Sequence, residues 1–265
     1  MTGLHYALVD AFADRPFTGN PAAVVRIDGA WPEDALLQAI AAETNQPETA
    51  FHRVAENGTI DLRWFSPATE VALCGHATLA TGHIILSVDP LRTRVDFRTR
   101  HSGVLTVTRD GDGYELALPT LALCPHPLPA FVAALGLADE PVATLWHAQG
   151  YALIVLADAD VVRRAAPDFR RLAAEGNILT IITAPGDDTD VISRAFAPGA
   201  GVDEDPVTGS AHAAMAPWWA ARLGRSHFSA FQASRRGGRL DCRVEGDRVI
   251  LRGRCITTIE GVLRR

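Results

Sequence analysis

The sequence predicts an α+β protein built from two copies of one domain, each a mostly antiparallel sheet around one apolar helix. Three observations predict this fold. Short motifs recur in the same order in the two halves, each half alternates strand-like segments with a helix rich in small residues, and prolines cluster between the halves. The chain has 265 residues, of which 48% are hydrophobic, enough for two small buried cores.

The recurring motifs define the two domains. Three pairs match: Ala41–Asn45 with Ala173–Asn177, Arg63–Pro67 with Arg194–Pro198, and Cys74–Ala77 with Thr208–Ala211. They keep their order and a nearly constant separation, far longer than the about 20–50 residues of a solenoid repeat. We therefore predict domains at residues 1–118 and 119–265, with a last strand that can cross back to the first domain.

The first half shows its elements in a clear order. Apolar residues at helical spacing predict a helix over Pro32–Glu43, and a strand over Ile60–Phe65 follows. Behind Gly75, the small and apolar run Ala77–Leu86 predicts a buried helix. Alternating residues predict antiparallel strands at Val104–Val107 and Tyr114–Leu118.

The second half repeats this order. A helix ends near Glu175, strands follow at Ile178–Thr183 and Val191–Phe196, and Gly209 opens a helix over Ser210–Leu223. A further alternating strand is expected at Arg248–Arg252. The boundary between the halves is marked by Pro119, Pro125, Pro127 and Pro129.

Composition excludes several functional classes. The net charge is −6 and no long basic block is present, so we expect no nucleic-acid partner. Apolar runs are no longer than strands, and the first ten residues lack a signal-peptide core, so we expect a cytoplasmic protein without a membrane partner. Four widely spaced cysteines indicate reduced thiols.

The sequence also argues against a cofactor. It contains neither a dinucleotide-binding glycine motif nor a phosphate-binding loop motif. Cys74, His76 and His83 resemble metal ligands by type, but the two histidines are separated by about two helical turns, too far for shared ligation. We expect neither a cofactor nor a metal.

Two helix starts, at Gly75-His76 and at Thr208-Gly209-Ser210, are candidate substrate sites. The first turn of a helix has free N–H groups and the positive end of the helix dipole, and glycine lets a ligand approach the backbone. Two such ends facing one ligand would bind a small carboxylate without lysine. The alternative is simple capping by Thr208 or Ser210.

Candidate acid and base groups lie near these starts. Glu48 lies in a short polar segment that leads into an apolar strand, where partial burial would raise its pKa toward values that suit acid–base catalysis. The alternative is a solvated loop glutamate. Asp205 precedes the second helix, either as a dipole partner or as a group that orients a histidine or binds a substrate amine. His76 and His212 lie in the two first turns.

These stretches together resemble the phenazine biosynthesis PhzF-like family. The resemblance covers most of the chain and rests on Asp10–Phe12, Phe17–Val24, Glu48–Phe51, Arg63–Pro67, Glu70-Val71, Cys74–Ala80 and Asp205–His212. It implies a diaminopimelate epimerase-like fold, in which each pseudo-symmetric half is a sheet curled around a central helix. It also implies a homodimer.

The family's known member is an isomerase of a dihydro-hydroxyanthranilate that uses neither cofactor nor metal. By resemblance, its proton-carrying glutamate falls on Glu48, and its assisting residues fall on His76, Asp205 and Ser210. The wider superfamily uses two facing cysteines, but here the second position is Thr208, whose hydroxyl is a poor proton carrier compared with the Cys74 thiol.

We therefore expect an isomerase that moves a proton between carbons of a small carboxylate bound between the two helix N-termini. The alternatives are an epimerase, racemase or dehydratase of a small amino or hydroxy acid, and a non-catalytic ligand-binding protein. The sequence leaves open the roles of His212 and of the arginine-rich segment with Arg235, Arg236 and Arg239.

Overall fold

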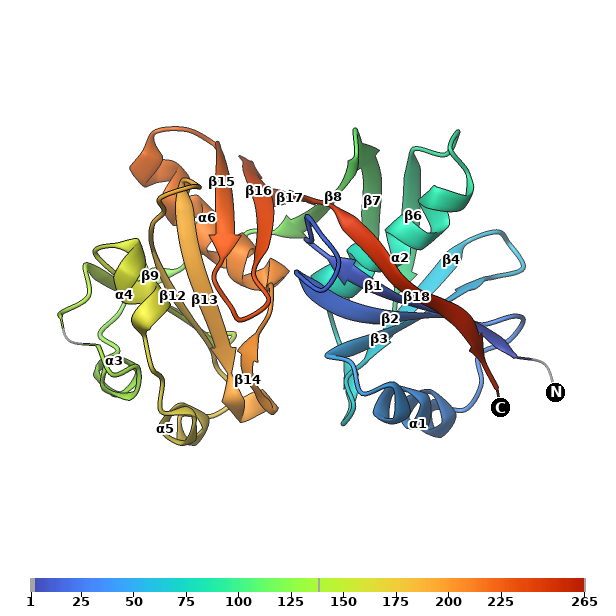
Figure 1. Cartoon of the computed structure of the whole chain (residues 1–265), viewed down its shortest axis with the longest axis horizontal. Coiled ribbons are helices and arrows are strands. Elements are labelled where there is room, and N and C mark those ends of the chain that lie inside the picture. The colour runs from blue at the N-terminus through green and yellow to red at the C-terminus, as the bar shows by residue number, and fades with distance from the viewer. Residues whose placement is uncertain (1–2, 138, 265) are drawn as a thin grey trace. The chain divides into compact units, whose positions relative to one another are not determined.

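The chain divides into two compact units, and the computed structural model describes residues 3–137 and 139–264. Unit 1 holds residues 1–118 and 252–265, and unit 2 holds residues 119–251. In Figure 1, strands surround one long helix in each unit, α2 in unit 1 and α6 in unit 2. No helix of the described residues has the length and apolar character needed to span a membrane.

Unit 1 combines a short and a long helix with a sheet. Its elements are β1 (Leu4–Ala11), β2 (Asn20–Arg26), α1 (Asp34–Thr44), β3 (Glu48–Val54), β4 (Ile60–Phe65), β5 (Glu70–Val71), α2 (Gly75–Val88), β6 (Arg94–Thr99), β7 (Val104–Asp110), β8 (Gly113–Pro119) and β18 (Cys255–Leu263). The last strand, β18, is antiparallel to β1, so the carboxyl-terminal segment completes the sheet of unit 1.

Unit 2 has the same plan with three short helices in addition to its long one. Its elements are β9 (Cys124–Pro125), α3 (Pro129–Ala134), β10 (Ala143–His147), β11 (Tyr151–Val155), α4 (Ala159–Arg164), α5 (Phe169–Ala174), β12 (Leu179–Pro185), β13 (Val191–Ala197), a 3-10 turn (Pro198–Ala200), β14 (Val202–Asp205), α6 (Gly209–Leu223), β15 (His227–Gln232) and β16 (Gly238–Glu245). Strand β17 (Arg248–Gly253) begins in unit 2 and ends in unit 1.

Strand pairing repeats between the units. Strands β2 and β3 are parallel, as are β11 and β12. In unit 1, β3 pairs antiparallel with β4, which runs parallel to β6. In unit 2, β12 pairs antiparallel with β13, which runs parallel to β15. The duplicated α+β fold predicted from the motifs is therefore confirmed. When the registers of β3–β4 and β12–β13 are aligned, Arg63 is equivalent to Arg194 and Glu48 is equivalent to Leu179.

The long helices are buried because small residues let them approach the sheet. Both begin at the glycine that the sequence predicts, Gly75 in α2 and Gly209 in α6. At Gly82 an added Cβ would lie 2.5 Å from the side chain of Val107, so only glycine allows α2 to pack this closely on β7.

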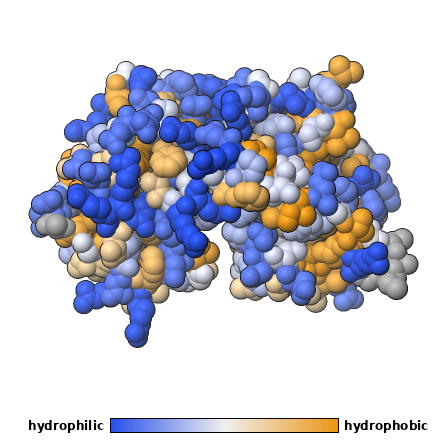
Figure 2. Space-filling model, viewed as in Figure 1, coloured by the Kyte–Doolittle hydropathy of each residue, from blue (hydrophilic) through white to orange (hydrophobic). Residues whose placement is uncertain are grey.

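The outer face of each sheet is covered differently. In unit 1, Leu37 and Ile40 of α1 pack in a hydrophobic cluster with Phe51 and Phe65. In unit 2, helices α3, α4 and α5 contribute to a larger cluster that includes Ile182 and Phe196. Hydrophobic side chains still reach the surface of unit 1, among them Ile259 and Val262 of β18, and hydrophobic patches are visible in Figure 2.

Candidate active site

Four polar side chains of unit 1 meet at the start of α2. Glu48 is the first residue of β3, and its Oε2 lies 3.3 Å from Nε2 of His76, the second residue of α2. On the other side of the imidazole, Nδ1 lies 3.2 Å from Nδ2 of Asn20 and 3.5 Å from the Cys74 sulfur. Asn20 is completely buried, whereas the Glu48 side chain is 20% exposed and therefore accessible to a small ligand.

The protonation of His76 follows from these neighbours. Burial lowers the pKa of His76 to about 3, so the ring is neutral near pH 7. An amide nitrogen only donates hydrogen bonds, so Asn20 Nδ2 donates to Nδ1 and the proton of the neutral ring lies on Nε2. The Nε2–H group therefore lies 3.3 Å from Oε2 of Glu48, although it forms no hydrogen bond with a described residue.

The same cluster contains three potential metal ligands. Ligand atoms of Glu48, Cys74 and His76 all lie within 4.8 Å of one another. A metal ion needs only one nitrogen of an imidazole, so these three side chains have ligand atoms of the right types close together. The expectation that the protein binds no metal stays a prediction.

His83, which the sequence places near these groups, serves a different purpose. Its Nδ1 lies 3.0 Å from the Tyr114 hydroxyl and its Nε2 lies 2.9 Å from the Thr257 hydroxyl. Both ring nitrogens thus contact hydroxyl groups of unit 1, and His83 is a structural residue.

In unit 2, Asp205 belongs to a fixed hydrogen-bond network. The buried Gln232 accepts from the Thr208 N–H (2.8 Å) and donates to the Asp205 carbonyl (2.7 Å) and to the Thr208 hydroxyl oxygen (3.1 Å). Because that oxygen accepts from Gln232, the hydroxyl hydrogen is directed to the Asp205 carboxyl. Asp205 is therefore held in one orientation, at the end of β14 beside the start of α6.

The two helix starts share a further detail. Within the described residues neither N-cap, Cys74 or Thr208, bonds its own helix through the side chain, so capping by Thr208 is not what the structure shows. The Thr78 hydroxyl donates to the Cys74 carbonyl, and at the equivalent position His212 Nδ1 donates to the Thr208 carbonyl (2.8 Å). Burial lowers the pKa of His212 to about 4, so His212 is a neutral, structural histidine.

The remaining predicted residues are distributed between the two units. Gly75 opens α2, while Gly209 and the partly buried Ser210 open α6. The arginine-rich segment forms the β15–β16 hairpin, where Arg239 stacks on Phe231 and the Ser234 hydroxyl donates to the Pro206 carbonyl (2.7 Å). The expectation that both helix starts serve one substrate stays a prediction.

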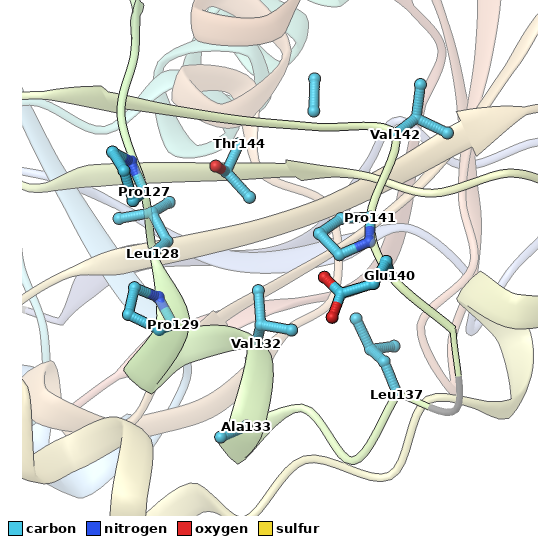
Figure 3. A pocket seen from close by; sticks show the side chains of 11 residues that line it. Pro127, Leu128, Pro129, Val132, Ala133, Leu137, Glu140, Pro141, Val142 and Thr144 are labelled. Atoms are coloured by element: carbon cyan, nitrogen blue, oxygen red, sulfur yellow. The ribbon is translucent and has the colours of Figure 1, made fainter.

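Two residues that orient the candidate groups, Asn20 and Gln232, were not identified by sequence reasoning. Asn20 belongs to a stretch that carries the family resemblance, which is the only signal for it; Gln232 has none. A cavity of about 620 Å³ in unit 2, shown in Figure 3, is lined by none of the predicted site residues. Glu140 is the one charged side chain among its described lining residues.

Comparison with known proteins agrees with this fold. Residues 9–261 match the family model described as phenazine biosynthesis-like protein. An uncharacterized isomerase of Pseudomonas aeruginosa is 45% identical over 257 residues, covering 96% of each chain. A phenazine biosynthesis PhzF family protein of Enterococcus faecalis has a similar crystal structure, with a TM-score of 0.92, 39% identity and complete coverage of both chains. A hydroxyproline epimerase of Agrobacterium vitis shares the fold, with a TM-score of 0.58, 12% identity and coverage of 98% of this chain and 92% of that one.

Proposed function

The chain belongs to the phenazine biosynthesis-like protein family, and we propose that it is a cofactor-independent isomerase in which Glu48 moves a proton between carbons of a small carboxylate substrate. The observation that carries the proposal is the contact between Glu48 and the neutral His76. A partly exposed carboxylate next to a buried, neutral imidazole has the form of a general base that a small substrate can reach. The isomerase name of relatives that match nearly the whole chain agrees with this class of reaction.

The asymmetry of the two units favours proton transfer on one face of the substrate. Inversion of a carbon centre requires one proton carrier on each side of it. The position equivalent to Glu48 is Leu179, and the position equivalent to Cys74 is Thr208, so each type of carrier occurs once. We therefore favour a shift of one proton by Glu48 over two-group epimerisation. Racemisation or dehydration of a small amino or hydroxy acid is the alternative reaction.

The first turn of α2 is the proposed site for the substrate carboxylate. Gly75 and His76 present backbone N–H groups at the positive end of the helix, next to the Glu48 carboxyl. The first turn of α6, with Gly209 and Ser210 beside the fixed Asp205, offers the same type of donors in unit 2. We assign Asp205 to positioning the substrate rather than to carrying a proton, because its carboxyl already accepts from Thr208.

Solvent deuterium exchange tests the proposal directly. Candidate small carboxylates, including unsaturated cyclic amino acids, are incubated with the protein in deuterated water and followed by NMR. An isomerase incorporates deuterium at a carbon position of the product, while a ligand-binding protein shifts ligand signals without exchange. If deuterium exchange persists in Glu48→Gln but is lost in Cys74→Ala, Glu48 is not the proton carrier and the Cys74 thiol takes that role.

We also propose that the protein forms a homodimer and is located in the cytoplasm. Light scattering at micromolar concentration tests the first: the mass of one chain is 28.4 kDa. A measured mass near that value would contradict the dimer.

A further inference from the structure

A second polar cavity lies in unit 1, on the outer face of the sheet, and none of the candidate catalytic residues lines it. Its volume is about 290 Å³. Its main lining residues are four arginines, one tryptophan and one aspartate: Arg53, Arg63, Arg98, Arg100, Trp31 and Asp61. The proposed isomerase reaction makes no use of these side chains.

Part of this arrangement is common to both units. Arg63 and its equivalent Arg194 each form an ion pair with a glutamate on the next strand, Arg63 with Glu70 (2.7 Å) and Arg194 with Glu204 (2.6 Å). Each guanidinium also stacks on the phenylalanine two residues further on, at 5.1 and 5.0 Å. This arginine–glutamate pair therefore belongs to the duplicated fold and needs no ligand to explain it.

The surroundings of the pair differ between the units. Around Arg194 the sheet face is apolar, with Ala184, Ile192 and Phe231, and these residues pack in one cluster with Val162 of α4. The carbonyl groups of Val162 and Ala165, at the end of α4, accept hydrogen bonds from Arg194 at 3.3 and 2.7 Å. Helix α4 thus covers this face of unit 2.

The strand registers align three residues of unit 1 with these apolar residues of unit 2: Arg53 with Ala184, Asp61 with Ile192, and Arg98 with Phe231. The described segment 27–33, which follows β2, contains no helix, and Trp31 of that segment borders the cavity. The cavity therefore occupies the place that α4 fills in unit 2. Three positions that are apolar in unit 2 are charged in unit 1, which packing does not require.

The charges in the cavity do not balance. Asp61 pairs with both Arg53 (3.1 Å) and Arg98 (2.6 Å), while Arg63 and Arg100 pair with Asp34 and Glu70. Four guanidinium groups thus share three carboxylates, in a protein of net charge −6. Arg98 and Arg100 are about half exposed, at 51% and 50%, so part of their donor capacity is directed to solvent.

From this geometry we infer that the cavity binds the phosphate group of a small ligand. Guanidinium groups donate two parallel hydrogen bonds to phosphate oxygens, and arginine is the usual residue for such recognition. A phosphate monoester carries up to about two negative charges near pH 7 and three acceptor oxygens, enough to contact several arginines at once. In unit 1 the donor equivalent to Nη1 of Arg194, Nη1 of Arg63, is already paired with Asp34 (2.8 Å), so the phosphate would contact mainly the half-exposed Arg98 and Arg100.

Titration calorimetry with inorganic phosphate at constant ionic strength tests the inference. The test variant is Arg98→Gln with Arg100→Gln. Both side chains are half-exposed, and each carboxylate they leave keeps another arginine, so we expect the variant to fold. The matched control is Arg163→Gln with Arg171→Gln, which removes two exposed, ion-paired arginines from the helices of unit 2.

We expect one saturable phosphate site per chain in the natural protein and in the control, and affinity at least about tenfold weaker in the test variant, because two positive charges are lost. Equal weakening in both variants would show a non-specific response to net charge and overturn the inference. Absence of saturable binding in the natural protein, or acetate bound as tightly as phosphate, would overturn it as well. None of these results depends on isomerase activity.

Discussion

The starts of α2 and α6 occupy the same place in a duplicated fold but have different chemistry. In unit 1, His76 follows the helix glycine and contacts Glu48; in unit 2, Ser210 follows the glycine and Leu179 stands at the position of Glu48. The carboxylate of unit 2 comes instead from Asp205, fixed by Thr208. Both helix starts thus have the same glycine and backbone donors, while a glutamate beside a histidine, the proposed proton carrier, occurs in unit 1 only.

The strongest test of this contrast is Glu48→Gln. The amide keeps the size and hydrogen bonding of the side chain but cannot carry a proton near neutral pH, so we expect turnover to fall by a factor of about 10² to 10⁴ with the fold intact. Deuterium incorporation into substrate measures the effect. Glu43→Gln, on the exposed face of α1, is the matched control and should leave the rate unchanged.

Asn20→Leu tests whether the orientation of His76 matters. It removes the donor that holds the ring proton on Nε2, so we expect a loss of about tenfold in rate, the value of one hydrogen bond. Nitrogen NMR of His76 should show the tautomer change independently of activity. Gln232→Leu, which releases Asp205 in unit 2, should leave the His76 signals in place. A change of the His76 tautomer in both variants would mean that the fold, not Asn20, controls the ring.

Acid should affect unit 1 more than unit 2. Burial lowers the pKa of His52 and His83 to about 4 and that of His76 to about 3, all in unit 1, whereas unit 2 has His212 at about 4. The unfolded chain binds these protons below about pH 6.5 and the folded chain excludes them, so stability is full above that pH and falls as the pH drops toward 4. Hydrogen exchange at pH 7 and pH 5, corrected for intrinsic rates, should show the larger loss of protection in unit 1. Equal losses in both units would contradict this ranking.

The smallest effect is expected from Cys74→Ala. The thiol contacts His76, but the position equivalent to Cys74 in unit 2 is Thr208, so a two-thiol reaction lacks its second thiol. We expect the rate to change by less than about threefold, since a thiol is only a weak hydrogen-bond donor. Loss of activity in this variant, together with normal activity of Glu48→Gln, would reverse the assignment of the proton carrier.

The sequence by itself determined the duplicated α+β fold and the first residues of both long helices. These depend on local signals: apolar periodicity, small residues and the glycines at Gly75 and Gly209. It also gave Glu48 and His76 as candidates, from their local context and from the family resemblance, without showing that they are in contact.

Only the tertiary structure decided which side chains meet. Asn20 and His76 are 56 residues apart in the chain, and Thr208 and Gln232 are 24 apart, so each contact depends on how distant strands and helices pack. The arginine cavity likewise became visible only when strand registers aligned Arg53, Asp61 and Arg98 with apolar residues of unit 2. Local sequence patterns determine whether a segment forms a helix or a strand. The hydrogen-bond partner of a buried polar group depends on how elements pack against one another, and a short stretch of sequence carries no information about that packing.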